Sequence, residues 1–329
     1  MGAGPSLAQS ALPKVGLQPD VTFADYPALA QNSELVRRMA TPLALAEMRR
    51  ILATTGKALA ERSLDLPREH FLVYVPPTAS PKGYGLFVFI SPWNDARLPP
   101  GWAGVLDRSG VIFVTAANSG NEASPIGRRQ PLALIAEQNI ERRYRVDAER
   151  VFVGGFSGGS RVALRLALGY PDVFRGVMLN AGSDPIGDAA APLPPTDLYA
   201  RFQRGSRLVY VTGGKDEARL ANDVDSMSSM RRWCVAGVMV EAMPYSGHQA
   251  PDAATLGRVL ADLQTPVRAD PTRLAACRST IDRDLAKALG QVGSLIALGR
   301  RDEAHRRLIK LDARFGGLAA PRSLDLAGK

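Results

Sequence analysis

The chain has 329 residues, of which 46% are hydrophobic, so it is long enough to bury a sizeable core. No run of about eighteen apolar residues occurs, and the sequence therefore predicts no membrane-spanning helix. The formal net charge of +9 is spread over arginine pairs such as Arg37-Arg38 and Arg128-Arg129, which are expected on solvated faces, and with only 6% aromatic residues the chain does not favour a nucleic-acid-binding surface.

The N-terminal region shows no strand pattern. Residues 1–32 are rich in Pro, Ala and Gln without periodicity, and they are expected to form an extended arm. Residues 33–62 have helical spacing that Pro42 interrupts, and a second helix is expected to begin there. The start of the chain lacks a charged segment followed by an apolar one and predicts no intact signal peptide, although "SLAQS" at residues 6–10 has the small residues found around a cleavage site.

Short apolar runs bounded by Pro and Gly follow, and helical patterns lie between most of them. The runs are residues 70–77, 85–90, 111–118, 150–155, 176–182, 207–214 and 238–245. Strands that are apolar on both faces and alternate with helices predict a mainly parallel sheet covered on both sides. Ligands of such sheets bind at the carboxyl ends of the strands, so the residues just after each run are the candidates for function.

The pattern becomes helical throughout after Pro266. The stretch "LIALGRRDEAHRRLIKLDARF" resembles one tetratricopeptide hairpin, and a single hairpin is expected to pack on the rest of the chain because repeats need neighbours. The predicted division is therefore an N-terminal arm with helices at 1–68, a catalytic α/β domain at 69–266 and a helical extension at 267–329.

A single serine stands among glycines where one apolar run ends and a helical pattern begins. Gly155-Phe156-Ser157-Gly158-Gly159 matches G-x-S-x-G in this strand-to-helix context, which predicts a nucleophile on a sharp, strained turn. Side chains at Gly155 and Gly159 are expected to collide with the chain at that turn. The stretch does not fit a nucleotide-binding loop, because it is not G-x-G-x-x-G and no Walker lysine follows.

A serine nucleophile needs a base, and the chain has three histidines. His70 lies at the start of a strand run and His305 lies among arginines of a helix, so neither is placed for catalysis. His248, in "PYSGHQAP", directly follows the last strand run, and it is the predicted base.

The base needs a carboxylate that fixes its tautomer, and chain order in this arrangement is serine, acid, histidine. Asp216 follows the penultimate strand run and is the favoured acid, and Asp184, one run earlier, is the alternative. Asp223 and Asp225 lie further along the next helix and are expected on the surface.

An oxyanion hole requires two N–H donors. The amide of Gly158 is the first predicted donor. The second is expected in "SPWNDARLPP" after the run at 85–90, where Pro92 has no N–H, so Trp93 is the candidate with Asn94 behind it. The stretch "ANSGNEAS" at 117–124 is expected to line the site. The proline-rich segment 183–206 is expected to be either a cap over the pocket or a surface loop.

From Phe71 to about Leu263 the chain resembles the α/β-hydrolase superfamily. Within it, "RRYRVDAERVFVGGFSGGSRVALRLALGYPDVFRG" is similar to polyhydroxybutyrate depolymerases, feruloyl esterases and related esterases, whose R-Y-x-V-D-x-x-R-V-x-V-x-G-x-S-x-G run is matched from Arg143 to Gly159. The resemblance implies an α/β-hydrolase fold and ester hydrolysis through serine, histidine and acid without a cofactor.

The sequence therefore predicts a serine carboxylester hydrolase with Ser157, His248 and Asp216 as its triad, acting on a small or polymeric ester. Peptidase or acyltransferase chemistry on the same triad is an alternative, and so is a catalytically silent interaction module that uses the helical tail. No nucleic acid and no metal are expected as partners.

The chain has two cysteines, Cys234 and Cys277, at no metal-binding spacing. A periplasmic or secreted location is expected, with a cytoplasmic one as the alternative. If the protein is exported, the two cysteines are predicted to pair and to join the helical extension to the catalytic body.

Overall fold

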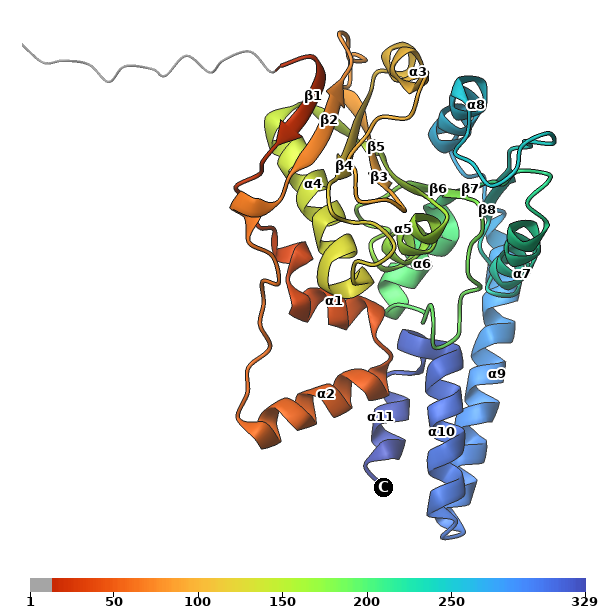
Figure 1. Cartoon of the computed structure of the whole chain (residues 1–329). Helices are drawn as coiled ribbons and strands as arrows, with labels where there is room; N and C mark the ends of the chain where they lie inside the picture. The colour runs from red at the N-terminus through yellow and green to blue at the C-terminus, as the bar shows by residue number, and fades with distance from the viewer. Residues whose placement is uncertain (1–13) are drawn as a thin grey trace, which may run out of the picture.

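The structure, a computed structural model, describes residues 14–329. The first part of the expected arm, with "SLAQS" at 6–10, lies outside the described residues. A single sheet forms the centre of the molecule (Figure 1). Its strands are β1 (Gly16–Val21), β2 (Phe71–Val75), β3 (Tyr84–Ile90), β4 (Val111–Ala116), β5 (Val146–Phe156), β6 (Gly176–Asn180), β7 (Arg207–Val211) and β8 (Gly237–Val240).

The strands lie in the order β1-β2-β4-β3-β5-β6-β7-β8. β2 is antiparallel to β1 and to β4, and the six strands β4, β3, β5, β6, β7 and β8 are parallel to one another. The side chains of the central strands are buried on both faces, as a parallel sheet covered by helices requires. The expected α/β-hydrolase fold is confirmed.

The expected arm contains a strand that the sequence pattern did not reveal. Residues 16–21, "GLQPDV", pair with β2 at the sheet edge, and their burial alternates because one face is open to solvent. Only Val21 packs against the core, and Pro19 is tolerated because the strand lies at an edge. The assignment of residues 1–32 to an arm is therefore corrected for 16–21, because edge pairing depends on a partner about 55 residues away.

Helices cover both faces of the sheet (Figure 1). They are α1 (Asn32–Met39), α2 (Pro42–Thr55), α3 (Trp102–Ser109), α4 (Gln130–Arg143), α5 (Gly158–Gly169), α6 (Thr196–Gly205), α7 (Glu217–Arg232), α8 (Ala253–Gln264), α9 (Pro271–Ala297), α10 (Arg301–Phe315) and α11 (Arg322–Ala327). α2 begins at Pro42 as expected, with the Thr41 side chain accepting from the Ala44 N–H. None of the helices in residues 14–329 is both long and apolar enough to cross a membrane.

Two apolar layers hold the helices to the sheet, one on each face. Phe87 and Phe89 of β3 pack with Trp102 of α3 and with α8. Leu86 and Val88 of the same strand point to the other face and pack with α4 and α5. This alternation along β3 is the two-residue period of a strand with both faces buried.

The helical extension after residue 266 packs on the body through α9 and α10, which lie side by side as an antiparallel pair (Figure 1). Cys277 of α9 forms a disulfide with Cys234, just after α7, so the predicted pairing is present in the structure. Phe315 at the end of α10 packs edge-on against Trp233. Asp312 of α10 accepts the Leu43 N–H at the start of α2, so the helical extension also contacts the N-terminal helices. The division at residues 68 and 266 stays a prediction.

Candidate active site

Ser157 stands between β5 and α5 with φ of 55° and ψ of −120°, a conformation that a non-glycine residue adopts only under constraint. Its N–H donates to the Asn180 carbonyl at the end of β6, at 2.9 Å. Its carbonyl accepts the Ser160 N–H at 3.0 Å, which begins the helix. The serine hydroxyl is thereby held at the carboxyl edge of the sheet, above the N-terminus of α5.

The flanking glycines are required by close backbone approach, as expected. A Cβ on Gly155 would collide with the backbone of Gly159 and lie 2.7 Å from the Ser160 nitrogen. A Cβ on Gly159 would collide with the carbonyl of Ile90, at the end of β3. The expected collisions at these two positions are confirmed, and they explain why the turn is glycine-rich.

The structure brings Ser157, His248 and Asp216 together, although 91 residues separate the serine from the histidine. His248 Nε2 lies 3.0 Å from Ser157 Oγ, and His248 Nδ1 lies 2.6 Å from Asp216 Oδ2. The Asp216 side chain is 12% exposed, whereas that of His248 is 43% exposed. This is the hydrogen-bond chain that a serine nucleophile, a general base and an orienting acid require.

Backbone pairing between the turns after β7 and β8 places the acid beside the histidine. The Gly214 N–H donates to Met243, and the Lys215 N–H donates to Ser246, at 2.9 and 3.0 Å. A Cβ on Gly214 would lie 2.6 Å from the Pro244 carbonyl, so the two turns meet at a distance that only glycine permits there. Asp216 and His248 follow these turns and are held in register by them.

Asp184, the alternative acid, lies elsewhere. Its carboxylate accepts from Arg161 Nε at 2.8 Å and from Arg165 Nη2 at 3.0 Å, and both arginines belong to α5. The segment that contains Asp184, residues 183–195, is not a free surface loop. It is bonded to the helical extension, because the Leu193 carbonyl accepts the Gly317 N–H.

The expectation that Asp223 lies on the surface is wrong. Its side chain is buried beside the carboxyl ends of β6 and β7, where Thr212 Oγ1 donates to it at 2.6 Å. Burial raises the pKa of Asp223 to about 6. The helical period of α7 turns this residue inward, whereas Asp225 is exposed as expected.

The loop that was expected to supply the second oxyanion donor adopts a fixed conformation. The Trp93 N–H donates to Ser91 Oγ at 3.1 Å, so the donor role predicted for Trp93 would require that bond to break. The Trp93 ring packs on Phe156, which in turn packs on the His248 ring at 4.9 Å between centroids. Trp93 therefore forms part of the wall beside the triad.

Asn121 is a neighbour of the nucleophile that the sequence indicated only as part of the stretch 117–124. Its side-chain amide lies against Gly158, where a Cβ would collide with Asn121 Oδ1. Its N–H donates to the Pro92 carbonyl at 3.0 Å, and the Gly120 N–H donates to Asn94 Oδ1 at 3.1 Å. These bonds fasten the loop after β4 to the loop after β3 and place an amide group beside the predicted oxyanion donor.

Arg129 was expected on a solvated face and is instead buried, with 4% of its surface exposed. Its guanidinium donates to the Ser91 carbonyl at 2.8 Å and lies 3.4 Å from the Gly158 carbonyl, and burial lowers its pKa to about 10. Among residues 14–329 no carboxylate lies within salt-bridge distance of it. A buried cation beside the Ser157 turn without an anionic partner would attract negative charge that develops there. An arginine pair gives no signal of this in the sequence.

Residues 114–242 match the family described as esterase PHB depolymerase. The match includes Ser157 and Asp216 and ends before His248. The resemblance to the polyhydroxybutyrate depolymerase group of esterases is thereby confirmed, over less than half of the chain, and it supports a hydrolase of the esterase type. No curated protein sequence matches the chain.

Solved structures resemble the chain at low identity. A ferulic acid esterase is 17% identical with a TM-score of 0.46, and the match covers 60% of this chain and 92% of that one. An S-formylglutathione hydrolase of Staphylococcus aureus is 10% identical with a TM-score of 0.48, over 60% and 93% of the two chains. A dipeptidyl peptidase 4 of Porphyromonas gingivalis is 16% identical with a TM-score of 0.43, over 59% of this chain and 33% of the peptidase. At these scores none of the three bears on the activity.

Proposed function

We propose that the protein hydrolyses carboxylic esters through an acyl-enzyme formed on Ser157. The observation that carries the proposal is the chain of hydrogen bonds from Asp216 through His248 to a serine on a strained turn. In the first step Ser157 Oγ attacks the ester carbonyl carbon while His248 Nε2 takes the hydroxyl proton. The imidazolium then gives this proton to the departing alkoxide, and the alcohol leaves.

Water completes the cycle in the same way. His248 removes a proton from water, the oxygen attacks the acyl carbonyl, and Ser157 leaves with the proton that His248 returns. Asp216 accepts the Nδ1–H of His248 throughout, and its mostly buried carboxylate stabilises the imidazolium.

The oxyanion of both tetrahedral intermediates is assigned to two donors, the Gly158 N–H and the side-chain amide of Asn121. Trp93 is the less suitable second donor because its N–H is already bonded to Ser91 Oγ. The Asn121 amide lies beside Gly158, and its Nδ2 carries two N–H groups that can donate to an oxyanion. The positive charge of Arg129, which lies near the Gly158 carbonyl, adds to the stabilisation of the oxyanion.

A series of p-nitrophenyl esters of graded acyl length tests this function. We expect the wild type to hydrolyse the esters. Ser157→Ala should lower kcat by about 10⁶-fold, because the base has no function once the nucleophile is removed. Aminoacyl p-nitroanilides and added alcohol acceptors in the same assay measure peptidase and acyltransferase chemistry. If Ser157→Ala retains ester hydrolysis within tenfold of the wild type, the serine is not the nucleophile.

We also propose that the protein works in the periplasm or outside the cell. The Cys234–Cys277 disulfide supports this location, because disulfides persist mainly in oxidising compartments. Mass spectrometry of periplasm-expressed protein after alkylation without reductant is the test. We expect no alkylated cysteine, and two alkylated cysteines would contradict the proposal.

A further inference from the structure

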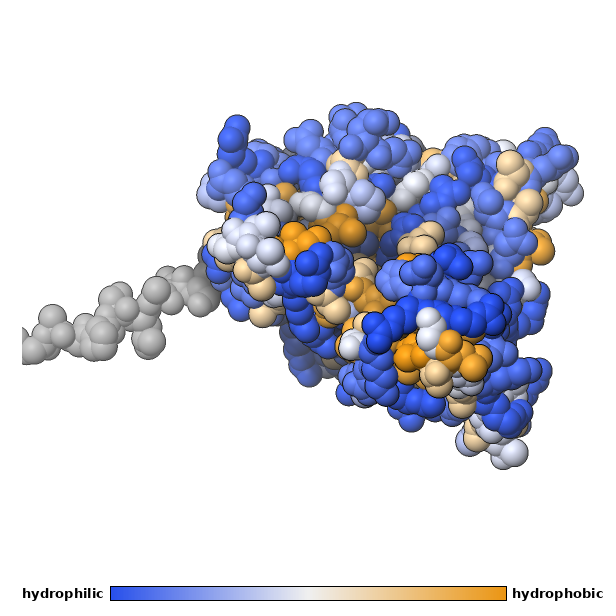
Figure 2. Space-filling model, turned by 90° about the horizontal axis from the view of Figure 1, so that it is seen from below, coloured by the Kyte–Doolittle hydropathy of each residue, from blue (hydrophilic) through white to orange (hydrophobic). Residues whose placement is uncertain are grey.

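The molecule has a large pocket that the proposed reaction does not use. It has a volume of about 1400 Å³ and lies among the α1–α2 corner, the outer face of α5, and helices α10 and α11. In the view from below, apolar surface lies within a hollow on this face (Figure 2). Three large hydrophobic side chains that line the pocket are at least a third exposed, namely Ile126 at 55%, Ile309 at 50% and Leu324 at 37%.

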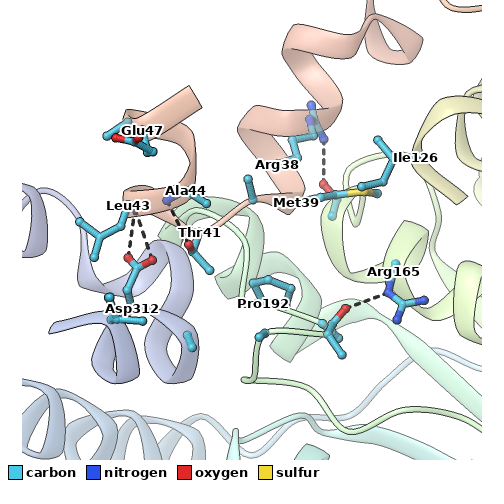
Figure 3. A pocket seen from close by; sticks show the side chains of 18 of the residues that line it. Arg38, Met39, Thr41, Leu43, Ala44, Glu47, Ile126, Arg165, Pro192 and Asp312 are labelled. Carbon is cyan, nitrogen blue, oxygen red and sulfur yellow. Dashed lines mark hydrogen bonds between the residues drawn. The ribbon is translucent and has the colours of Figure 1, made fainter. Parts of the chain in front are cut away.

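The Arg, Glu and Asp side chains of the lining are each bonded to another group of the protein. Figure 3 shows Leu43, Ala44, Met39 and Pro192 around the opening, with Asp312 turned to the start of α2. Each charged group already has a partner: Arg38 with Asp172, Arg50 with Glu47, Arg165 with Asp184, and Asp312 with the Leu43 N–H. His305 is the other titratable side chain of the lining, and it is exposed. The pocket therefore suits a neutral, apolar ligand rather than an anion or a cation.

Two separate segments run from the triad to this pocket. On α5, Gly158 follows the nucleophile and Arg165 lines the pocket, seven residues or about 10 Å further along the helix. After β4, Asn121 lies against Gly158 and Ile126 lines the pocket. The partly exposed positions of α5 between Ser157 and the pocket are those of Arg161 and Arg165, so the route passes over the stems of two arginines whose guanidinium groups are bonded to Asp184.

We propose that this pocket binds the aliphatic chain of a long-chain ester whose carbonyl is at Ser157. The inference rests on the proposed function. The occupant is assigned from the neutral apolar lining and from the continuity of α5 between nucleophile and pocket. An extended chain advances by little more than 1 Å for each carbon–carbon bond of about 1.5 Å, so only a chain of about eight carbons or more reaches the pocket. Short esters use the triad without it.

The kinetic test compares p-nitrophenyl dodecanoate with p-nitrophenyl acetate. Ile309→Asp places a charge in the pocket at a half-exposed position, and Ile51→Asp is the matched control on α2, 47% exposed and outside the lining. We expect Ile309→Asp to lower the dodecanoate-to-acetate ratio of kcat/KM by about tenfold or more, since burial of two methylenes already corresponds to such a factor. Ile51→Asp should leave the ratio at the wild-type value. Equal ratios in all three proteins would overturn the inference, while acetate hydrolysis that depends on Ser157 would still support the proposed function.

A binding test separates the pocket from catalysis. Ser157→Ala protein is titrated with N-phenylnaphthylamine, a neutral fluorescent probe, and decanol is added as competitor. We expect probe binding that decanol displaces, weakened by about tenfold or more when Ile309→Asp is added and unchanged with Ile51→Asp. Such binding would support the pocket even if no ester were hydrolysed. Absence of displaceable binding would overturn it, and so would a concentration-dependent dimer that Ile309→Asp abolishes without changing the ester ratio, because the occupant would then be a second copy of the chain.

Discussion

Two histidine–aspartate pairs of this molecule have the same local geometry in different surroundings. His248 Nδ1 lies 2.6 Å from Asp216, and His70 Nδ1 lies 2.6 Å from Asp20. The Asp20 side chain is 74% exposed, whereas Asp216 is 12% exposed. The other ring nitrogen of His248 faces the Ser157 hydroxyl at 3.0 Å.

The comparison shows that the pair by itself does not make a site. The His70 pair joins the edge strand β1 to the residue before β2, where both groups are open to water. An exposed ion pair contributes little because water screens it. The His248 pair differs because a strained serine, a mostly buried carboxylate and amide groups lie around it. Changes that remove these surroundings one at a time test that difference.

The largest effect that separates the two pairs is expected from removing the acid. Asp216→Asn keeps the shape but lets the imidazole of His248 take the wrong tautomer, and we expect a loss of about 10⁴-fold in kcat. Asp20→Asn is the matched change at the exposed pair and should leave kcat within about twofold. The two kcat values on one good ester decide the point. If kcat fell strongly in Asp184→Asn and stayed near the wild-type value in Asp216→Asn, the acid would be Asp184, one strand earlier.

The next effect concerns the oxyanion donor. Asn121→Ala removes the amide beside Gly158, and loss of one such donor costs about 10²-fold in kcat or more. KM for the ester should change little, because the amide is needed most in the transition state. Steady-state measurements of kcat and KM on Asn121→Ala and on Asn94→Ala distinguish the proposed donor, Asn121, from the neighbouring Asn94. A normal kcat in Asn121→Ala would return the role to the backbone of the loop after β3.

A smaller effect is expected from the buried cation. Arg129→Met should lower kcat by about tenfold and weaken binding of a boronic acid inhibitor by a similar factor, since the charge acts on the developing oxyanion. Arg150→Met is the control: it also removes a partly buried arginine that donates to backbone carbonyls, but at Ser109 and Gly83, at the other end of the strands. Equal inhibitor affinity in Arg129→Met and wild type would mean that Arg129 has a structural role only.

The smallest effect on activity is expected at Asp223, where the signal is the pH dependence of stability. Burial raises the folded-state pKa to about 6, so the folded protein holds a proton that the unfolded chain has lost between about pH 4 and 6. The contribution of this group to the free energy of unfolding therefore falls as pH rises through that window and is constant above it. Asp223→Asn should remove this slope. Thermal melting of both proteins from pH 4 to 8 measures it, and parallel curves would contradict the assignment.

Most of the sheet could be predicted because its strands are apolar runs separated by helical patterns. The meeting of Ser157, Asp216 and His248 could be predicted as well, because parallel strands end at one edge of the sheet and bring the three residues there. β1 could not, since "GLQPDV" contains a proline and buries little apolar surface of its own.

The sequence could not predict the burial of Arg129 and Asp223 or the presence of the apolar pocket. Arg129 and Asp223 are polar residues whose burial depends on contacts with segments far away in the chain. The pocket is formed by α2, α5, α10 and α11, which no local pattern brings together.

The central claim, that Ser157 is a nucleophile activated by His248, is tested most directly by labelling with a fluorophosphonate probe and locating the adduct by peptide mass spectrometry. We predict one adduct, on Ser157, in the wild type and in Asp20→Asn. Ser157→Ala should give none, and His248→Gln should slow labelling by about 10³-fold or more, because the serine then lacks its base. An unlabelled wild type, or an adduct on another residue that persists in Ser157→Ala, would contradict the account.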